Sequence, residues 1–154
     1  DNQLPDLIEQ AAVVDEVKKI KGKLKVHMVG ARCLRKADTG FSGDSSDPYC
    51  ECSIGSTNVK TKHVSKSLNP DWVDFKFIPF TIAANKVKDG AEGNLPNLRV
   101  KVMDNDTMAF DDFLGEADVD WTECWNNPGK WMVNSEFKLE DPEKRVSDKK
   151  NPVK

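Results

Sequence analysis

The sequence has no long hydrophobic run, because no stretch approaches the ~20 apolar residues that a membrane-spanning helix needs. It also has no apolar N-terminal segment of the kind that marks a secretory signal. These two absences predict that no part of the chain spans a membrane. Because the chain begins with Asp1 and not with Met, we expect it to be part of a longer protein.

A surplus of basic residues is also missing. The 154 residues include 23 Lys and Arg against 26 Asp and Glu, which gives a net charge of −3. A nucleic-acid-binding domain usually has a basic surplus, so we predict no nucleic-acid partner. The only two histidines, His27 and His63, lie far in sequence from the acidic segments described below. An enzyme needs a base within reach of its nucleophile, so we predict that the chain is not an enzyme.

The four cysteines suggest neither a disulfide framework nor a zinc site. Cys50 and Cys52 lie two residues apart on a predicted strand, so their Cα atoms are ~7 Å apart, which is awkward for a mutual disulfide. A zinc site would need another pair of thiolates or imidazoles. We interpret the cysteines as small buried residues of a protein in a reducing compartment. They are Cys33, Cys50, Cys52 and Cys124.

Alternation of apolar and polar residues predicts a protein built from short β-strands. Seven segments qualify, separated by turns rich in Gly, Pro, Asn and Ser, and no strong helix lies between them. This pattern favours an all-β sandwich over a parallel α/β sheet. The fourth segment carries Trp72, Phe75, Phe77 and Phe80, which we expect to supply core. The seven segments are 23–30, 49–54, 59–64, 72–80, 98–102, 114–119 and 137–139.

The two ends of the chain differ from its middle. Val13, Val17 and Ile20 recur at helical spacing, and Gly22 is suited to a helix C-cap, so a short N-terminal helix is predicted. The last residues are highly charged. We therefore divide the chain into a helical or linker segment (1–21), a β-domain (22–140) and a charged tail (141–154).

Two acidic segments follow predicted strands. Asp104, Asp106, Asp111 and Asp112 lie within nine residues that contain no Lys or Arg. Like charges this close repel each other, so they need solvent, a basic partner or a cation. A similar segment runs from residue 38 to residue 47. We predict that the two segments meet as loops and bind metal together.

Calcium is the metal that these loops favour. It takes ~6–8 oxygen ligands in flexible geometry, whereas magnesium demands a strict octahedron that loops do not easily impose. Five carboxylates balance two calcium ions to within one charge, so we predict two or more ions. The five are Asp38, Asp47, Asp104, Asp106 and Asp112.

Other interpretations of the acidic segments are weaker. Aspartate is common in turns, so both segments could be solvated loops. An EF-hand beginning at Asp104 fails, because Ala109 and Gly115 occupy the positions that need Gly and a bidentate Glu. Asp104 and Asp106 also resemble the nucleophile motif of haloacid-dehalogenase phosphatases, but that fold needs helices alternating with strands.

Several motifs occur together in the order typical of one family. Over about residues 22–140, the chain resembles the calcium- and lipid-binding C2 domains of synaptotagmins, protein kinase C and multi-C2 membrane-tethering proteins. The resemblance implies an eight-stranded antiparallel β-sandwich of the Greek-key type, with calcium loops at one end. The eighth strand would come from residues 144–147 or from the N-terminal region. The motifs are Gly22-Lys-Leu-Lys-Val, Ser46-Asp47-Pro48-Tyr49, Lys60-Thr-Lys62, Leu68-Asn69-Pro70-x-Trp72, Asp104-x-Asp106 and Asp112-Phe113-Leu114-Gly115.

The resemblance also implies a ligand set. Asp38 and Asp47 would bind calcium from the first loop, and Asp104, Asp106 and Asp112 from the third, together with the backbone carbonyl of Asn105. The first loop is longer than usual, so Asp44 could replace or supplement Asp38. Ala109 stands where many members have a serine ligand, which weakens one peripheral ion site.

By the same resemblance, the expected function is calcium-dependent binding to anionic phospholipid membranes, as a targeting module of a larger cytoplasmic, peripheral membrane protein. Calcium would make the negative loop tips neutral or positive, and lipid phosphates would complete its coordination. Phe41, Met108 and Phe110, at the expected loop tips, would enter the membrane interface.

A basic surface is the second expected contact. Lys60 and Lys62, with Lys66, would form a basic face on one strand, and in the family this surface can bind phosphoinositides or acidic proteins. A calcium-independent module that binds proteins or phosphoinositides is therefore the alternative function.

Overall fold

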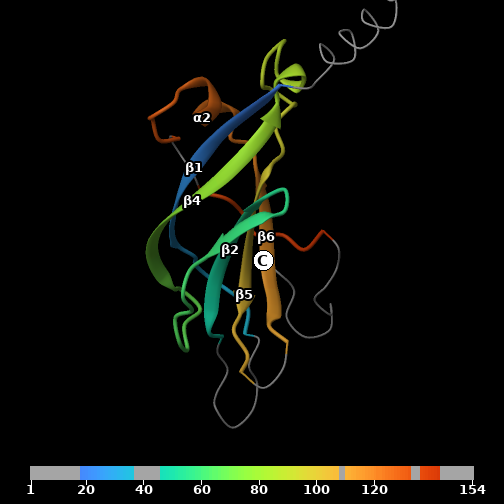
Figure 1. Cartoon of the computed structure of the whole chain (residues 1–154). Coiled ribbons are helices and arrows are strands. Elements are labelled where there is room, and N and C mark those ends of the chain that lie inside the picture. The colour runs from blue at the N-terminus through green and yellow to red at the C-terminus, as the bar shows by residue number, and fades with distance from the viewer. Residues whose placement is uncertain (1–17, 37–45, 108–109, 133–135, 143–154) are drawn as a thin grey trace, which may run out of the picture.

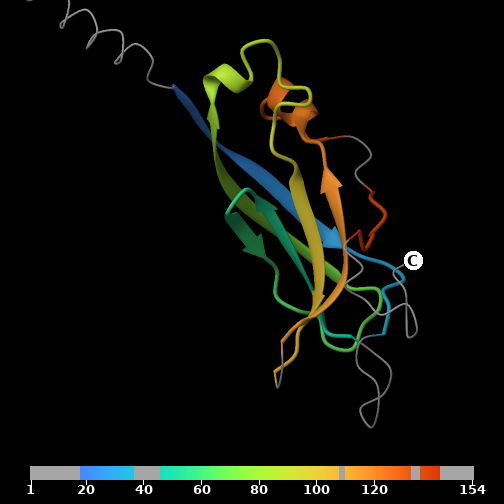
Figure 2. The same ribbon diagram turned by 90° about the vertical axis from the view of Figure 1, so that its right-hand side faces the viewer.

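The structure is a computed structural model that describes residues 18–36, 46–107, 110–132 and 136–142. Strands dominate these ranges, with one 3-10 helix and one short α-helix. Figures 1 and 2 show them as two layers, with β1 and β4 lying across the other strands. The elements are β1 (Lys19–Gly30), β2 (Pro48–Ile54), β3 (Thr57–Lys60), β4 (Asp71–Ala83), η1 (Ala84–Lys86), β5 (Leu98–Asp104), β6 (Asp112–Val119) and α2 (Thr122–Asn126).

Every pair of these strands is antiparallel, which confirms the all-β sandwich. One sheet pairs β1 with β4, and the other has the order β3-β2-β5-β6. The described residues thus hold six of the eight expected strands. The segment 137–139 lies beside a single bridge between Glu116 and Glu140, and the predicted strand at 144–147 lies outside the described residues.

The predicted strand over 59–64 is wrong beyond Lys60, where β3 ends. The N–H of Thr61 still donates to the carbonyl of Cys50 at 2.9 Å, but the N–H of Cys50 donates to the Thr61 hydroxyl at 3.0 Å. A side chain thus replaces one of the two ladder bonds at this position. The chain still follows β2, because the N–H of Val64 donates to the carbonyl of Pro48 at 2.9 Å. As a result, Lys62 lies after the strand and not on it.

The prediction that a helix ends at Gly22 is also wrong, because β1 already begins at Lys19. Residues 19–22 pair with the end of β4, and Gly22 lies opposite Phe80. A Cβ at Gly22 would come within 2.5 Å of the tip of the Phe80 ring. Pairing with a distant strand therefore overrides the local helical spacing. The rest of the predicted helix, residues 1–17, lies outside the described residues.

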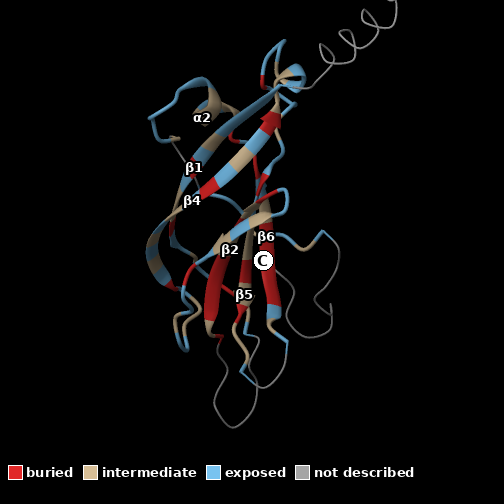
Figure 3. Ribbon diagram, in the orientation of Figure 1, coloured by how far each residue is buried: buried red, intermediate tan, exposed pale blue. Residues whose placement is uncertain are grey.

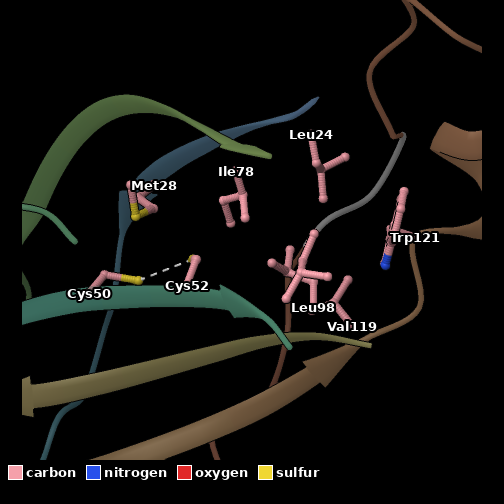
Figure 4. Packing of buried hydrophobic residues seen from close by; sticks show 9 residues of the cluster. Leu24, Met28, Cys50, Cys52, Ile78, Leu98, Val119 and Trp121 are labelled. Atoms are coloured by element: carbon pink, nitrogen blue, oxygen red, sulfur yellow. Dashed lines mark hydrogen bonds between the residues drawn. The ribbon is translucent and has the colours of Figure 1, made fainter. Parts of the chain in front are cut away.

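The core lies between the two layers and is closed at one end by Trp121 (Figure 4). Ile78 of β4 and Cys52 of β2 are among its most buried members. Cys50 and Cys52 are free thiols whose sulfurs lie 4.0 Å apart, as expected for side chains on one face. Their contact and their burial raise the pKa of the Cys50 thiol. The expectation of burial holds for this pair but is wrong for Cys33, which is exposed.

The aromatic residues of β4 divide between its two faces. Trp72 and Phe80 pack against the core, but Phe75 and Phe77 are 47% and 56% exposed, so the prediction that all four supply core is wrong. Strand side chains alternate between faces, and the even-numbered residues of β4 point inward. Figure 3 shows the resulting exposure along β1 and β4, in contrast to the buried strands β2, β5 and β6.

A cleft of about 900 Å³ separates part of the two layers. Its walls are β1, the inner faces of β2, β5 and β6, and described residues between 131 and 139. Among the described strands, β1 has one hydrogen-bonded neighbour, β4, so its layer is narrower than the four-stranded one. Within the part of the chain that the structure describes, the sandwich is therefore open along the second edge of β1.

Candidate metal-binding site

Three acidic positions come together because of strand register. Asp104, the last residue of β5, is the Cα partner of both Pro48 in β2 and Asp112 in β6. Asp47 directly precedes Pro48. Figure 1 shows the start of β2, the end of β5 and the start of β6 at the same end of the sandwich. The antiparallel sheet thus brings together Asp47 and Asp112, which are 65 positions apart in sequence.

Asp104 is fully buried, with 0% exposure, at this end of the sheet. Its Oδ1 accepts the backbone N–H of Asp47 at 2.6 Å. In the opposite direction, the N–H of Asn105 donates to the backbone carbonyl of Asp47 at 2.9 Å. These bonds fix the two predicted ligands against each other.

Asp47 is held from a second side by the loop that follows β3. Its Oδ1 accepts the backbone N–H of Lys66 at 2.7 Å. Lys66 itself lies in the left-handed region of backbone conformation, with a φ of 51°. An ionised carboxylate oxygen has more than one lone pair, so this bond leaves Asp47 able to bind a cation.

Asp111 organises the third loop, a part that the sequence did not predict. Its Oδ1 accepts the N–H of Asp106 at 2.9 Å, and its Oδ2 accepts the Tyr49 hydroxyl at 2.5 Å. The Tyr49 hydrogen bond is the main cause of a lowered pKa at Asp111, with the Asp106 amide next. Burial, together with this bond, raises the pKa of Tyr49. Asp111 therefore positions the backbone of the predicted ligand Asp106 and connects it to Tyr49 of β2.

The signal for this contact was present in the sequence. Tyr49 follows Asp47-Pro48 at the start of a strand, and it is the only tyrosine in the chain. A tyrosine with an apolar ring and a buried end normally needs a partner for its hydroxyl. The nearby surplus carboxylate of Asp111 is that partner.

The base of the first loop is also fixed in place. The Ser46 hydroxyl donates to the carbonyl of Arg35 at 2.9 Å, and Arg35 donates to the carbonyl of Phe113 in β6 at 2.5 Å. The Trp72 indole N–H donates to the Pro48 carbonyl at 2.9 Å. Arg35 and Ser46, on the two sides of segment 37–45, are thus tied together beside the acidic strand ends.

Part of the predicted site lies outside the described residues. This applies to the candidate ligands Asp38 and Asp44, to Ala109, and to the tip residues Phe41 and Met108. Within the described ranges, no three His, Cys, Asp or Glu side chains converge as a metal-binding group. The donor set still fits a hard cation in kind, because all the acidic groups at these strand ends are oxygen donors.

The remaining predicted contact residues are exposed. Phe110 is 97% exposed beside the third loop. Lys60, Lys62 and Lys66 are all exposed, but only Lys60 lies on β3, so the expected basic face on one strand is wrong in that respect. The three lysines instead follow the chain from β3 into the loop that holds Asp47. Lys60 lies near Asp111 and helps to lower its pKa.

The fold and these strand ends define a β-sandwich module with acidic loops at one end. The chain belongs to the C2 domain family, because the sequence model of that family matches residues 22–134.

Curated relatives support the same family. Human C2 domain-containing protein 5 is 32% identical over 120 residues, which cover 78% of this chain and 11% of that protein. Mouse extended synaptotagmin-3 is 30% identical over 122 residues, 78% of this chain and 12% of that protein. The chain therefore spans about a tenth of the length of these relatives.

Solved structures share the fold. A calcium-bound structure of the two C2 domains of extended synaptotagmin 2 matches 68% of this chain and 36% of that chain, with a TM-score of 0.52 and 24% identity. Human GIVD cytosolic phospholipase A2 matches 73% of this chain and 15% of that chain, with a TM-score of 0.55 and 24% identity. In the described part of our chain, no helix is long and apolar enough to cross a membrane.

Proposed function

We propose that this C2 domain binds calcium at the acidic strand ends and thereby docks on membranes that contain anionic phospholipid. The ligands are the carboxylates of Asp38, Asp47, Asp104, Asp106 and Asp112 and the backbone carbonyl of Asn105, with Asp44 as a further candidate. Two or more ions balance these charges.

One observation carries the proposal. The Cα register of β2, β5 and β6 sets Asp47, Asp104 and Asp112 at adjacent strand ends. An all-carboxylate group of this kind repels itself unless a cation offsets the charge. The bonds from backbone amides to Asp47 and Asp104 hold the loops in place before an ion arrives. A preformed site loses less conformational entropy when it binds.

Docking follows from the change in charge. The ions offset the negative loop tips, so anionic head groups approach and their phosphate oxygens complete the coordination shell. Phe110, exposed at the third loop, then enters the interface together with Phe41 and Met108. Lys60, Lys62 and Lys66 add attraction from the side of the sheet.

Calorimetric titration with calcium tests the proposal. Wild-type protein should bind two or more ions, and the double variant Asp104→Asn with Asp106→Asn should lose most of that heat. Asparagine keeps an acceptor oxygen, so the bond from the Asp47 N–H to residue 104 is retained. A double variant at Asp118→Asn and Asp120→Asn, which removes the same charge from exposed positions, is the control. Equal binding in both double variants would reject the site.

A second candidate function is a calcium-independent module that binds phosphoinositides or proteins. It is favoured by the exposure of Lys60, Lys62 and Lys66, which follow the chain from β3 into the loop beside Asp47. Sedimentation with phosphatidylserine vesicles, with and without a calcium chelator, separates the two. Binding that is unchanged by the chelator, and that is lost when the exposed residues Lys60, Lys62 and Lys66 are replaced with Gln, supports this second candidate.

A further inference from the structure

The outer face of the β1–β4 sheet carries two parallel rows of side chains. Odd-numbered residues of β1 point away from the core, and four of them are lysines. The pairing register places Lys21 opposite Thr81, Lys23 opposite Pro79 and Lys25 opposite Phe77. We call this surface the basic-aromatic face. It consists of Lys19, Lys21, Lys23, Lys25, Phe75 and Phe77.

The lysines of this face are exposed and have no ion pair within the described residues. Other basic residues nearby form ion pairs, since Arg32 pairs with Asp71 and Lys76 pairs with Asp74. Four positive charges thus lie in one row of a chain whose net charge is −3. The row spans ~20 Å, at ~3.3 Å per strand residue. The face therefore attracts an extended anionic surface.

Aromatic rings form the other end of the face. Phe75 and Phe77 are about half exposed, and Trp131, 57% exposed, lies against the same end. The Lys25 ammonium lies 4.9 Å from the Phe75 ring centre and 5.6 Å from the centres of Phe77 and Trp131. Exposed aromatic patches of this kind mark interaction sites.

We propose that the basic-aromatic face is a second membrane-docking surface, which binds anionic phospholipid without calcium. Protein surfaces that bind at a membrane interface combine lysines with Phe and Trp. The aromatic rings enter the head-group region, and the ammonium groups contact lipid phosphates. A nucleic acid fits less well, because the Lys25 ammonium lies over the ring faces on which bases would stack.

This surface is separate from the acidic strand ends. It runs along the side of β1 and β4, whereas Asp47, Asp104 and Asp112 lie at the tips of the other sheet (Figure 1). The proposal goes beyond calcium-dependent docking and does not depend on it.

The test measures binding of the 154-residue chain to vesicles in a calcium chelator, at ~0.1 M salt where exposed charges still act over ~10 Å. Vesicles of phosphatidylcholine alone are compared with vesicles that also contain phosphatidylserine. We expect binding only to the second kind. The triple variant Lys21→Gln, Lys23→Gln and Lys25→Gln should weaken it about 100-fold, at about 5-fold for each lysine.

Matched variants separate a specific face from total charge. Lys86→Gln, Lys88→Gln and Lys138→Gln remove three exposed lysines elsewhere and should weaken binding much less. Brominated lipid should quench the fluorescence of Trp131 when the protein is bound to the vesicles. The Trp131→Phe variant is the control, because it should lose this quenching. All six lysine substitutions are on exposed side chains, and equal melting temperatures verify the fold.

Each of three results would overturn the proposal. In the first, the wild type does not bind the vesicles in chelator; in the second, the two triple variants lose equal affinity; in the third, the lipid does not quench the fluorescence of Trp131. Tighter binding of a short oligothymidylate or of polyglutamate than of the vesicles would also overturn it. The Asp104→Asn and Asp106→Asn double variant should keep its binding in chelator. If calcium adds no binding while the lysine effect remains, the calcium proposal fails and this one stands.

Discussion

Single residues at the acidic end have two kinds of task. Asp104 and Asp47 are predicted ligands that also accept backbone amides. Asp111 instead connects the third loop to β2 through Tyr49 and to Asp106 through its amide. Asp111, which was not part of the ligand set predicted from the sequence, thus positions other residues, and only its contacts reveal this role.

Replacing Tyr49 with Phe should raise the pKa of Asp111 toward its ordinary value, because the hydroxyl is the main cause of the lowered value. A carboxyl with a lowered pKa stabilises the fold above its unfolded pKa, and this contribution is lost as the pH falls through the folded pKa. Tyr49→Phe should therefore be less stable than wild type near pH 7, with the difference shrinking in acid. Carbon-detected NMR titration of the Asp carboxyls measures the shift.

Asp120 is the internal control for that titration. Its pKa is lowered by the Thr122 hydroxyl and then by the Thr122 amide, far from Tyr49 in sequence. It should titrate identically in wild type and Tyr49→Phe. An Asp111 pKa that does not move, or an Asp120 pKa that moves equally, contradicts the assignment.

Among the elements, β4 shows most clearly how alternation divides one strand. Ile78 is 0% exposed, whereas its neighbour Phe77 is on the outer face. Hydrophobicity alone ranks the phenylalanines as core residues. Phe75 and Phe77 are nevertheless on the surface, because the register with β1 turns the odd-numbered residues of β4 outward.

We expect Ile78→Ala to lower the free energy of unfolding by ~2–5 kcal/mol, since it removes buried methyl groups and leaves a cavity. Phe77→Ala removes a larger side chain but should cost clearly less, because about half of the ring is in water already. Urea unfolding of both variants measures the difference. A loss at Phe77 equal to that at Ile78 would mean that the outer face is covered in solution.

For the whole molecule, the two layers set where charge accumulates. Acidic residues gather at the tips of β2, β5 and β6, and lysines gather along the outside of β1. A chain with a net charge of −3 thereby presents both signs on separate surfaces. The proposed response to calcium belongs to this scale, because a ligand that binds only the folded state stabilises the entire domain.

Calcium at about 100 times its dissociation constant should stabilise the domain by ~2.7 kcal/mol for each site, which raises the melting temperature by roughly 5–10 °C. Differential scanning fluorimetry with calcium, and with magnesium as the comparison ion, measures the shift. The Asp104→Asn and Asp106→Asn double variant should show little gain. A shift of the same size in that variant would place the bound ions elsewhere.

The sequence by itself determined the all-β class, the family and the acidic strand ends, because alternation, turn residues and short motifs are local signals. It did not determine that β1 begins at Lys19, that Phe75 and Phe77 face outward, or that Asp111 joins Tyr49. Each of these depends on pairing or contact between residues distant in the chain. The same distant pairing, Pro48 with Asp104 and Asp104 with Asp112, brings the predicted ligands together, and only the tertiary structure supplies it.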